Sequence, residues 1–227
     1  MKQAHSVQQP SILAPLRLVA RPVWALILIA LSSLAGATTL LSVSIDELTQ
    51  RAEFVFEGEV VSVQAQRGGS RGMVSTFVTF RIIDTIKGSA GGETLELKFL
   101  GGSFEGERLE VNGSRIPERG ERGVYFVESL SQDLINPLLG WSQGQYLIQS
   151  QGGVEQVTSV DARPIVSVSA PVSSSAPDPR SASARRAAPL RLEAEPTIAE
   201  GLTSENAGSV NGLSPQAFKQ GIRALLP

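Results

Sequence analysis

The sequence predicts a mainly β fold: a small closed or partly open antiparallel β-barrel with short flanking helices. Two long runs, Glu53 to Gln66 and Val74 to Lys87, flank a Gly-rich turn, and the second run alternates apolar and polar residues as a half-buried strand does. Shorter strand-like runs follow without long helical patterns between them, which indicates an antiparallel or mixed sheet. A strand of a dozen residues spans about 40 Å, so we expect the long strands to coil and close a barrel.

The first 37 residues are typical of an export signal. Basic residues precede an apolar run from Val23 to Leu31, and small residues lead to Ala37, after which we expect cleavage. An uncleaved membrane anchor is the alternative, but it requires about 20 apolar residues, more than this run supplies. The mature protein is therefore expected in the periplasm or outside the cell, without a stable membrane anchor.

Charge and composition exclude several classes of function. Removal of residues 1–37 leaves 17 basic and 22 acidic side chains, a net charge near −5, which does not favour nucleic acid as a partner. The chain has no cysteine, and its one histidine, His5, lies in the predicted signal. The mature protein therefore lacks the residues of Ser-His-Asp and Cys-His nucleophiles and of ordinary zinc sites. We expect no enzyme activity, no cofactor and no metal.

The remaining elements follow in order along the chain. Ser44 and Glu47 fit a capping box that starts a short helix over Ile45 to Arg51, and Gly58 marks a bulge or sharp bend in the first long strand. Further strands are expected over Glu93 to Leu100, Gly123 to Glu128, Leu138 to Gln149 and Val154 to Val160, and an irregular excursion or weak hairpin over Ser103 to Arg115.

The barrel domain is expected over residues 38–160, and two segments follow it. Residues 161–211 are rich in Pro, Ser and Ala, and we expect a disordered linker because this composition buries too little apolar surface to offset its ordering entropy. Residues 212–227 predict a C-terminal helix with Ser214 as N-cap, Pro215 at the first position, and Phe218 and Ile222 on one face. This helix is expected to dock on the barrel or on a partner.

One group of candidate functional residues surrounds two adjacent glycines. Gly101 and Gly102 lack the lysine and the following helix of a phosphate-binding loop, so they are interpreted as turn glycines and kept as candidate binding residues. The acids Glu105, Glu107 and Glu110 follow, and a carboxylate pair could serve acid/base or glycosidase chemistry. A solvated acidic loop beside arginines is the favoured interpretation, because such clusters are usually surface charge.

A second group of candidates lies between residues 140 and 146. Trp141, Gln143, Gly144 and Tyr146 combine aromatic faces with an amide, a combination that suits sugar or peptide binding. The alternative is that both aromatic side chains pack on the end of the barrel.

The order of short motifs along the chain resembles a family of exported bacterial proteins. The motifs are Glu57-Gly58-Glu59-Val60-Val61, Lys87-Gly88, Gly101-Gly102, Pro117 to Glu121, Val124 to Val127 and Gly140-Trp141-Ser142-Gln143-Gly144. Members of that family are similar to the OB-type barrel of netrin modules and tissue inhibitors of metalloproteinases, and some are encoded near secreted zinc proteases. The resemblance covers roughly Ser44 to Val160 and implies an OB-like barrel.

This resemblance, with the missing catalytic residue types, implies a non-catalytic module that binds another exported protein, with a secreted metalloprotease as the candidate partner. The animal inhibitors reach the protease zinc through an N-terminal cysteine and a disulfide-tethered ridge, whereas this chain has no cysteine, which puts that mechanism of inhibition in doubt. Two alternatives stay open: a carbohydrate or envelope-surface binder that uses Trp141 and Tyr146, and a carboxylate-dependent hydrolase.

Overall fold

The computed structural model describes residues 42–68, 72–169 and 197–227, all of which belong to the unit Leu40–Pro227. The predicted signal and its cleavage site after Ala37 lie outside the described residues. Within these ranges no helix has the length and apolar character needed to cross a membrane.

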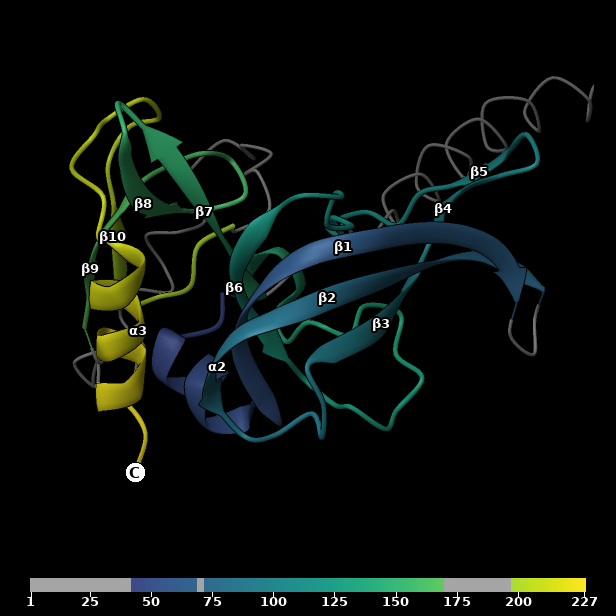
Figure 1. The fold of residues 1–227 in the computed structure, drawn as a ribbon, viewed down its shortest axis with the longest axis horizontal. Helices are drawn as coiled ribbons and strands as arrows, with labels where there is room; N and C mark the ends of the chain where they lie inside the picture. Colours follow the sequence, from purple (N-terminus) through teal and green to yellow (C-terminus); the bar gives the residue numbers. More distant parts are fainter. Residues whose placement is uncertain (1–41, 69–71, 170–196) are drawn as a thin grey trace, which may run out of the picture. The chain divides into compact units, whose positions relative to one another are not determined.

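Six antiparallel strands form the main sheet, in the order β3-β2-β1-β6-β7-β8 (Figure 1). Their bounds are β1 Phe54–Gly68, β2 Met73–Lys87, β3 Thr94–Leu100, β6 Arg122–Val127, β7 Gln145–Gln151 and β8 Val154–Thr158. The prediction of a mainly β, antiparallel fold is confirmed. The hydrogen-bonded order of the described strands starts at β3 and ends at β8, so these pairings do not show a closed barrel.

The long hairpin β1–β2 bends where the sequence predicts it. The two strands pair from Val55 and Lys87 to the hairpin end, and the register shifts at three points, one of them between Glu57 and Gly58. A side chain at Gly58 would bring its Cβ within 2.5 Å of Cε2 of Phe56, so the ring lies against the bare backbone. The bulge at Gly58 is therefore confirmed, and glycine is required there by this close approach.

Both faces of β1 and β6 are buried, each in its own apolar core. Alternation along β1 sends Val55 to one core and Phe54 and Phe56 to the other, and β6 divides its residues in the same way. The second core includes Phe56, Phe80 and Tyr125, whose ring centroids lie 4.7 to 5.5 Å apart. The prediction that the Gly123–Glu128 run is buried on both faces is confirmed over Gly123–Val127.

Helix α2, Ile45–Arg51, has the predicted bounds and the predicted N-cap. Ser44 Oγ accepts a hydrogen bond from the Glu47 amide at 3.1 Å, while the Glu47 carboxylate pairs with Arg51 one turn later. At the other end of the helix, Lys87 Nζ donates to the carbonyl oxygens of residues 49, 50 and 52 at 2.6 to 2.9 Å. A cation at this end satisfies carbonyls that have no partner within the helix and complements the helix dipole.

The interpretation of residues 161–211 as a disordered linker is wrong at both ends. Strand β9, Ile165–Val168, pairs antiparallel with β10, Leu202–Ser204. Ile165 is fully buried in the first core, and the Ala199 amide donates to Tyr146 Oη at 3.2 Å. The composition of this segment did not predict these strands, because each strand is short and pairs with a strand that is distant in sequence. Residues 170–196 of the predicted linker lie outside the described residues.

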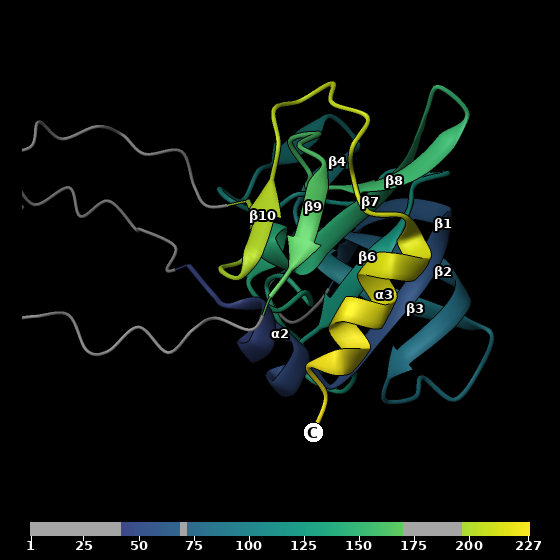
Figure 2. The same ribbon diagram turned by 90° about the vertical axis from the view of Figure 1, so that its left-hand side faces the viewer.

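Helix α3, Pro215–Ala224, covers the first core and confirms the predicted C-terminal helix. Ser214 Oγ accepts from the Ala217 amide at 3.2 Å, and Pro215 occupies the first turn. Phe218 and Ile222 are fully buried. Figure 2 shows α3 lying across the sheet with β9 beside it and β10 beyond β9, so the helix docks within its own chain.

Charged side chains of alternating sign join α3 to the sheet. Lys219 Nζ lies 2.6 Å from Glu57 Oε2 on β1 and 2.6 Å from Asp84 Oδ2 on β2. Arg122 of β6 donates to Glu57 through Nε at 2.7 Å, and Arg223 of α3 donates to Asp84 at 3.0 Å. Burial would raise the pKa of Asp84, but hydrogen bonds from Lys219 and Arg223 outweigh it and hold that pKa below its ordinary value.

Two tyrosines lie in the cores, and they are the only tyrosines of the chain. Tyr125 and Tyr146 are both fully buried, on opposite faces of the sheet. Burial raises the pKa of both hydroxyl groups well above the ordinary 10.0, because the phenolate would lose its hydration.

We therefore expect the protein to lose stability in alkali. Its two tyrosines should not ionise while the protein is folded. Above about pH 10 the unfolded chain releases phenolic protons that the folded chain keeps, so the free energy of unfolding falls as the pH rises. In a spectrophotometric titration, tyrosinate absorbance should appear in one step together with the loss of the circular dichroism signal. Gradual ionisation near the ordinary tyrosine pKa in a protein that stays folded would contradict this expectation.

Candidate functional site

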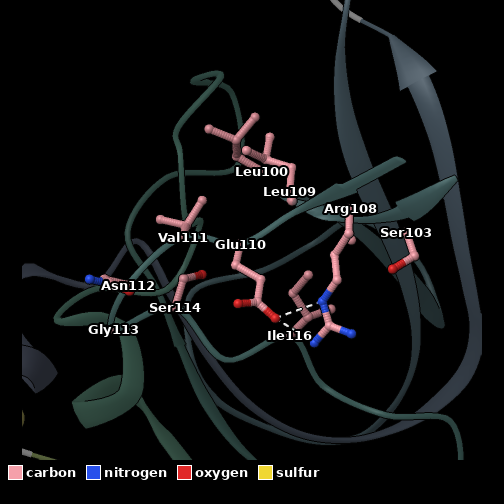
Figure 3. A pocket seen from close by; sticks show the side chains of 12 residues that line it. Leu100, Ser103, Arg108, Leu109, Glu110, Val111, Asn112, Gly113, Ser114 and Ile116 are labelled. Carbon is pink, nitrogen blue, oxygen red and sulfur yellow. Dashed lines mark hydrogen bonds and ion pairs between the residues drawn. The ribbon is translucent and has the colours of Figure 1, made fainter. Parts of the chain in front are cut away.

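A groove of about 450 Å³ lies where the chain leaves β3. It is lined by Leu100–Ser103 on one side and by residues 108–114 and Ile116 on the other (Figure 3). This volume is in the range of ordinary ligand pockets. The groove contains two of the predicted binding residues, Gly101 and Gly102.

Gly101 and Gly102 form part of one wall of the groove. Both have a backbone conformation that favours glycine. Gly101 and Gly102 have φ angles of 108° and 122°, which disfavour any residue with a Cβ. The Gly101 amide donates to the Val74 carbonyl at 2.9 Å, and Thr76 Oγ1 donates to the Gly101 carbonyl at 2.7 Å. A Cβ at Gly102 would lie 2.2 Å from Thr76 Oγ1. The pair is therefore fixed against β2, and its backbone forms the groove wall.

A short hairpin continues from the glycines. Strands β4, Gly102–Phe104, and β5, Glu107–Leu109, are joined by Glu105 and Gly106, whose φ angles of 49° and 85° match a type I′ turn. The hairpin is attached to β1 by an ion pair of 2.8 Å between Arg67 and Glu107. Of the two alternatives predicted for Ser103 to Arg115, an irregular excursion or a weak hairpin, the structure shows a hairpin over residues 102–109.

The opposite wall is a turn held by two polar contacts. The Ser114 amide donates to the Val111 carbonyl at 3.1 Å, and Gly113 has a φ of 75°, which suits the third position of a type II turn. Ser142 Oγ donates to the Gly113 carbonyl, and Asn136 Nδ2 donates to Ser114 Oγ, both at 2.9 Å. These contacts fix the wall to the segment that carries Trp141.

The lining combines aliphatic side chains with one exposed ion pair. Leu100, Leu109, Val111 and Ile116 are each half-buried, so part of their apolar surface faces solvent. Arg108 and Glu110, two residues apart on the same wall, pair through Nε and Oε1 at 2.7 Å (Figure 3), with side chains 73% and 69% exposed. Exposed pairs of this kind contribute little to stability, so a charged group of a ligand can replace either partner.

The predicted surface formed by residues 141–146 is not a single binding site. Tyr146 is fully buried between Phe126 and Phe218, so its use as a stacking platform for sugars is wrong. Gln143 is also buried, and its Oε1 accepts from the Val43 amide at 2.8 Å. A Cβ at Gly144 would lie 2.2 Å from the Leu139 carbonyl oxygen. These three residues are structural: Tyr146 packs in the first core, Gln143 accepts from the Val43 amide, and Gly144 lies against the Leu139 backbone.

Trp141 is the one member of that group that is half-buried. It lies in the short 3₁₀ helix η2, Trp141–Gly144, with a φ of 56° that non-glycine residues seldom adopt. Its neighbour Ser142 contacts the groove wall through Gly113. Trp141 itself is not among the residues that line the groove.

The acidic residues after the glycines are solvated. Glu105, Glu107 and Glu110 are all exposed, and the last two pair with Arg67 and Arg108. This arrangement matches the interpretation as an acidic loop beside arginines, with no buried carboxylate pair among the three. Within the described ranges, no group of three or more His, Cys, Asp or Glu side chains is placed to hold a metal ion.

Sequence reasoning missed most of the groove. Leu109 and Val111 alternate with Glu110 over too short a run to predict a surface, and Ile116 follows only after Asn112-Gly113, so the three gave no signal of a common surface. The usable signal was the double glycine followed by a glycine-containing turn at Asn112-Gly113, because each feature reverses the chain and the two reversals enclose a space.

Comparisons of the chain with protein-family models, with curated proteins and with solved structures found no match. The interpretation of the groove therefore depends on its geometry and chemistry.

Proposed function

We propose that the protein is a non-catalytic, exported binding module that takes a segment of another exported protein into the groove between Gly101-Gly102 and the turn at Asn112-Gly113. The framework proposed for it is an OB-like barrel, and a secreted metalloprotease is the partner that the sequence resemblance favours. The export signal predicted over residues 1–37 supports an encounter with such a partner. No histidine or cysteine follows that signal, which favours binding over nucleophilic catalysis.

The observation that carries the proposal is the composition of the groove. Four half-buried aliphatic side chains surround an ion pair that a ligand can displace. This combination suits an extended peptide segment with one aliphatic side chain for the groove and one acidic side chain for Arg108. Aliphatic contact would supply affinity, and the charged pair would select the orientation of the segment.

A groove variant tests the proposal directly. Replacement Leu109→Arg places a charge among the aliphatic residues, and loss of one buried leucine-sized contact is expected to weaken binding roughly tenfold to a hundredfold. Val210→Arg is the matched control, since Val210 is 62% exposed and lies outside the groove. Tagged mature proteins would be incubated with the exported fraction of the producing cell, and captured proteins would be identified by mass spectrometry.

The expected result is one partner that binds the wild type and the Val210→Arg variant but not the Leu109→Arg variant. Circular dichroism and thermal melting of the three proteins must agree, so that lost binding cannot be ascribed to unfolding. Equal capture of the partner by the Leu109→Arg variant would contradict the role of the groove. A wild type that captures nothing specific would contradict the proposed function.

A further inference from the structure

We propose that Asn112 is a site of spontaneous deamidation, where the backbone nitrogen of Gly113 converts the asparagine to aspartate or isoaspartate. The Gly113 nitrogen gives its proton to a base and attacks Asn112 Cγ. A C–N bond forms, the bond from Cγ to Nδ2 breaks, and Nδ2 takes up a proton and leaves as ammonia. Water then opens the cyclic imide at either carbonyl, so one water is consumed for each ammonia released. Glycine favours this reaction because no side chain shields its nitrogen.

The geometry at Asn112 leaves the attacking nitrogen available. Asn112 is exposed at the tip of the turn that forms the groove wall. The turn is closed by the hydrogen bond from the Ser114 amide to the Val111 carbonyl at 3.1 Å, which does not involve the Gly113 amide. Among the described residues, the Gly113 amide has no hydrogen-bond acceptor. The proton that this nitrogen must lose is therefore not held by a hydrogen bond within the described part of the chain.

The chain contains a second Asn-Gly pair, Asn211-Gly212, in which the glycine backbone nitrogen donates a hydrogen bond. The Gly212 amide donates to Gln156 Oε1 at 3.1 Å, and Asn211 Nδ2 lies 3.4 Å from Glu205 Oε2. A Cβ at Gly212 would lie 3.1 Å from Cβ of Pro164, so this backbone is also tightly packed. Ring closure at Asn211 requires that the Gly212 hydrogen bond break first. Asn211 is thus an internal control with the same local chemistry.

Deamidation would change the charge of the groove. A carboxylate at position 112 adds one negative charge to a lining that holds Arg108 and Glu110. If the groove binds an acidic segment, which rests on the proposed function, the modified protein would bind more weakly. The modification itself does not depend on any partner.

The test is a time course on the full mature protein in mildly alkaline buffer, with peptide mass spectrometry at both sites. We expect Asn112 to deamidate at least about fivefold faster than Asn211, the factor that corresponds to breaking one ordinary hydrogen bond. In concentrated urea the two rates should converge, because the unfolded chain protects neither site. Equal rates in the folded protein, or faster reaction at Asn211, would overturn the proposal.

Two variants at Gln156 separate the hydrogen bond from other causes. Gln156→Ala removes the acceptor of the Gly212 amide, and the rate at Asn211 should rise toward that at Asn112. Gln156→Glu keeps an acceptor oxygen and should leave Asn211 slow. A folded Gln156→Ala protein with an unchanged rate at Asn211 would overturn the role of the hydrogen bond. Mass is the readout throughout, so failure of the proposed binding function would leave these results unaffected.

Discussion

Replacement of Phe218 by alanine is expected to lower the free energy of unfolding by about 3 to 5 kcal/mol. Phe218 is fully buried, and its ring centroid lies 5.2 Å from that of Tyr146. The side chain fills the space between α3 and the sheet, so its removal leaves a cavity that the docked helix cannot close. Urea denaturation followed by circular dichroism measures the loss.

Phe77 provides the matched control for Phe218. It is half-buried on β2, where it pairs with Gln64 and Lys98 between polar neighbours on both strands. We expect Phe77→Ala to cost much less, because solvent fills the vacated space. If Phe218→Ala destabilised the protein no more than Phe77→Ala, the docking of α3 in the first core would be contradicted.

Replacement of Lys219 by methionine is expected to cost about 3 kcal/mol, the low end of the range for breaking a buried ion pair. The Glu57 side chain is only 1% exposed and would keep Arg122 as its single cation. Burial lowers the pKa of Lys219, but its hydrogen bonds to Asp84 and Glu57 outweigh this and raise it above the ordinary value. Two carboxylates therefore stabilise the Lys219 ammonium. Without it, Glu57 and Asp84 each lose one of their cationic partners.

A double variant shows whether the cost comes from the unpaired charge. Glu57→Gln with Lys219→Met removes both members of the pair, and we expect it to recover part of the loss caused by Lys219→Met alone. The comparison requires the two single variants and the double variant, unfolded in urea under the same conditions. Strictly additive losses would show that Lys219 and Glu57 do not interact.

The strands were predictable because their pattern is local. Alternation in Val74–Lys87 and the apolar run in Gly123–Glu128 place β2 and β6 to within a residue or two. The pairing of β9 with β10 could not be predicted, because each strand is only three or four residues long and the two are far apart in sequence. The two strands are stabilised by tertiary packing of Ile165 in β9 and of Ala199, which precedes β10. The strand propensity of a short local sequence does not predict such packing.

The ion pair under α3 could have been predicted from residue positions. Along the helix, Pro215, Phe218, Lys219 and Ile222 share the buried side, so Lys219 interrupts an apolar stripe. Along β1, Glu57 follows the same alternation as Val55 and faces the same core. Two opposite charges at buried positions predict a pair, since an isolated buried charge is too costly.

The candidate site was predicted only in part. Gly101 and Gly102 line the groove, whereas Gln143, Gly144 and Tyr146 support the fold. The difference has a physical cause. A glycine pair with positive φ indicates a chain reversal at the surface. An aromatic residue in a strand does not indicate whether another element covers its side of the sheet. The helix that covers Tyr146 comes more than sixty residues later in the chain.

Site-specific photocrosslinking in the producing cell tests the role of the groove most directly. A photoreactive amino acid would replace Asn112, an exposed residue of the groove, and in a second protein Val210, which is exposed outside it. We predict an adduct with one exported protein from position 112, no such adduct from position 210, and loss of the adduct when Leu109→Arg is added. The same adduct from both positions, or an adduct from position 112 that persists with Leu109→Arg, would contradict binding in the groove.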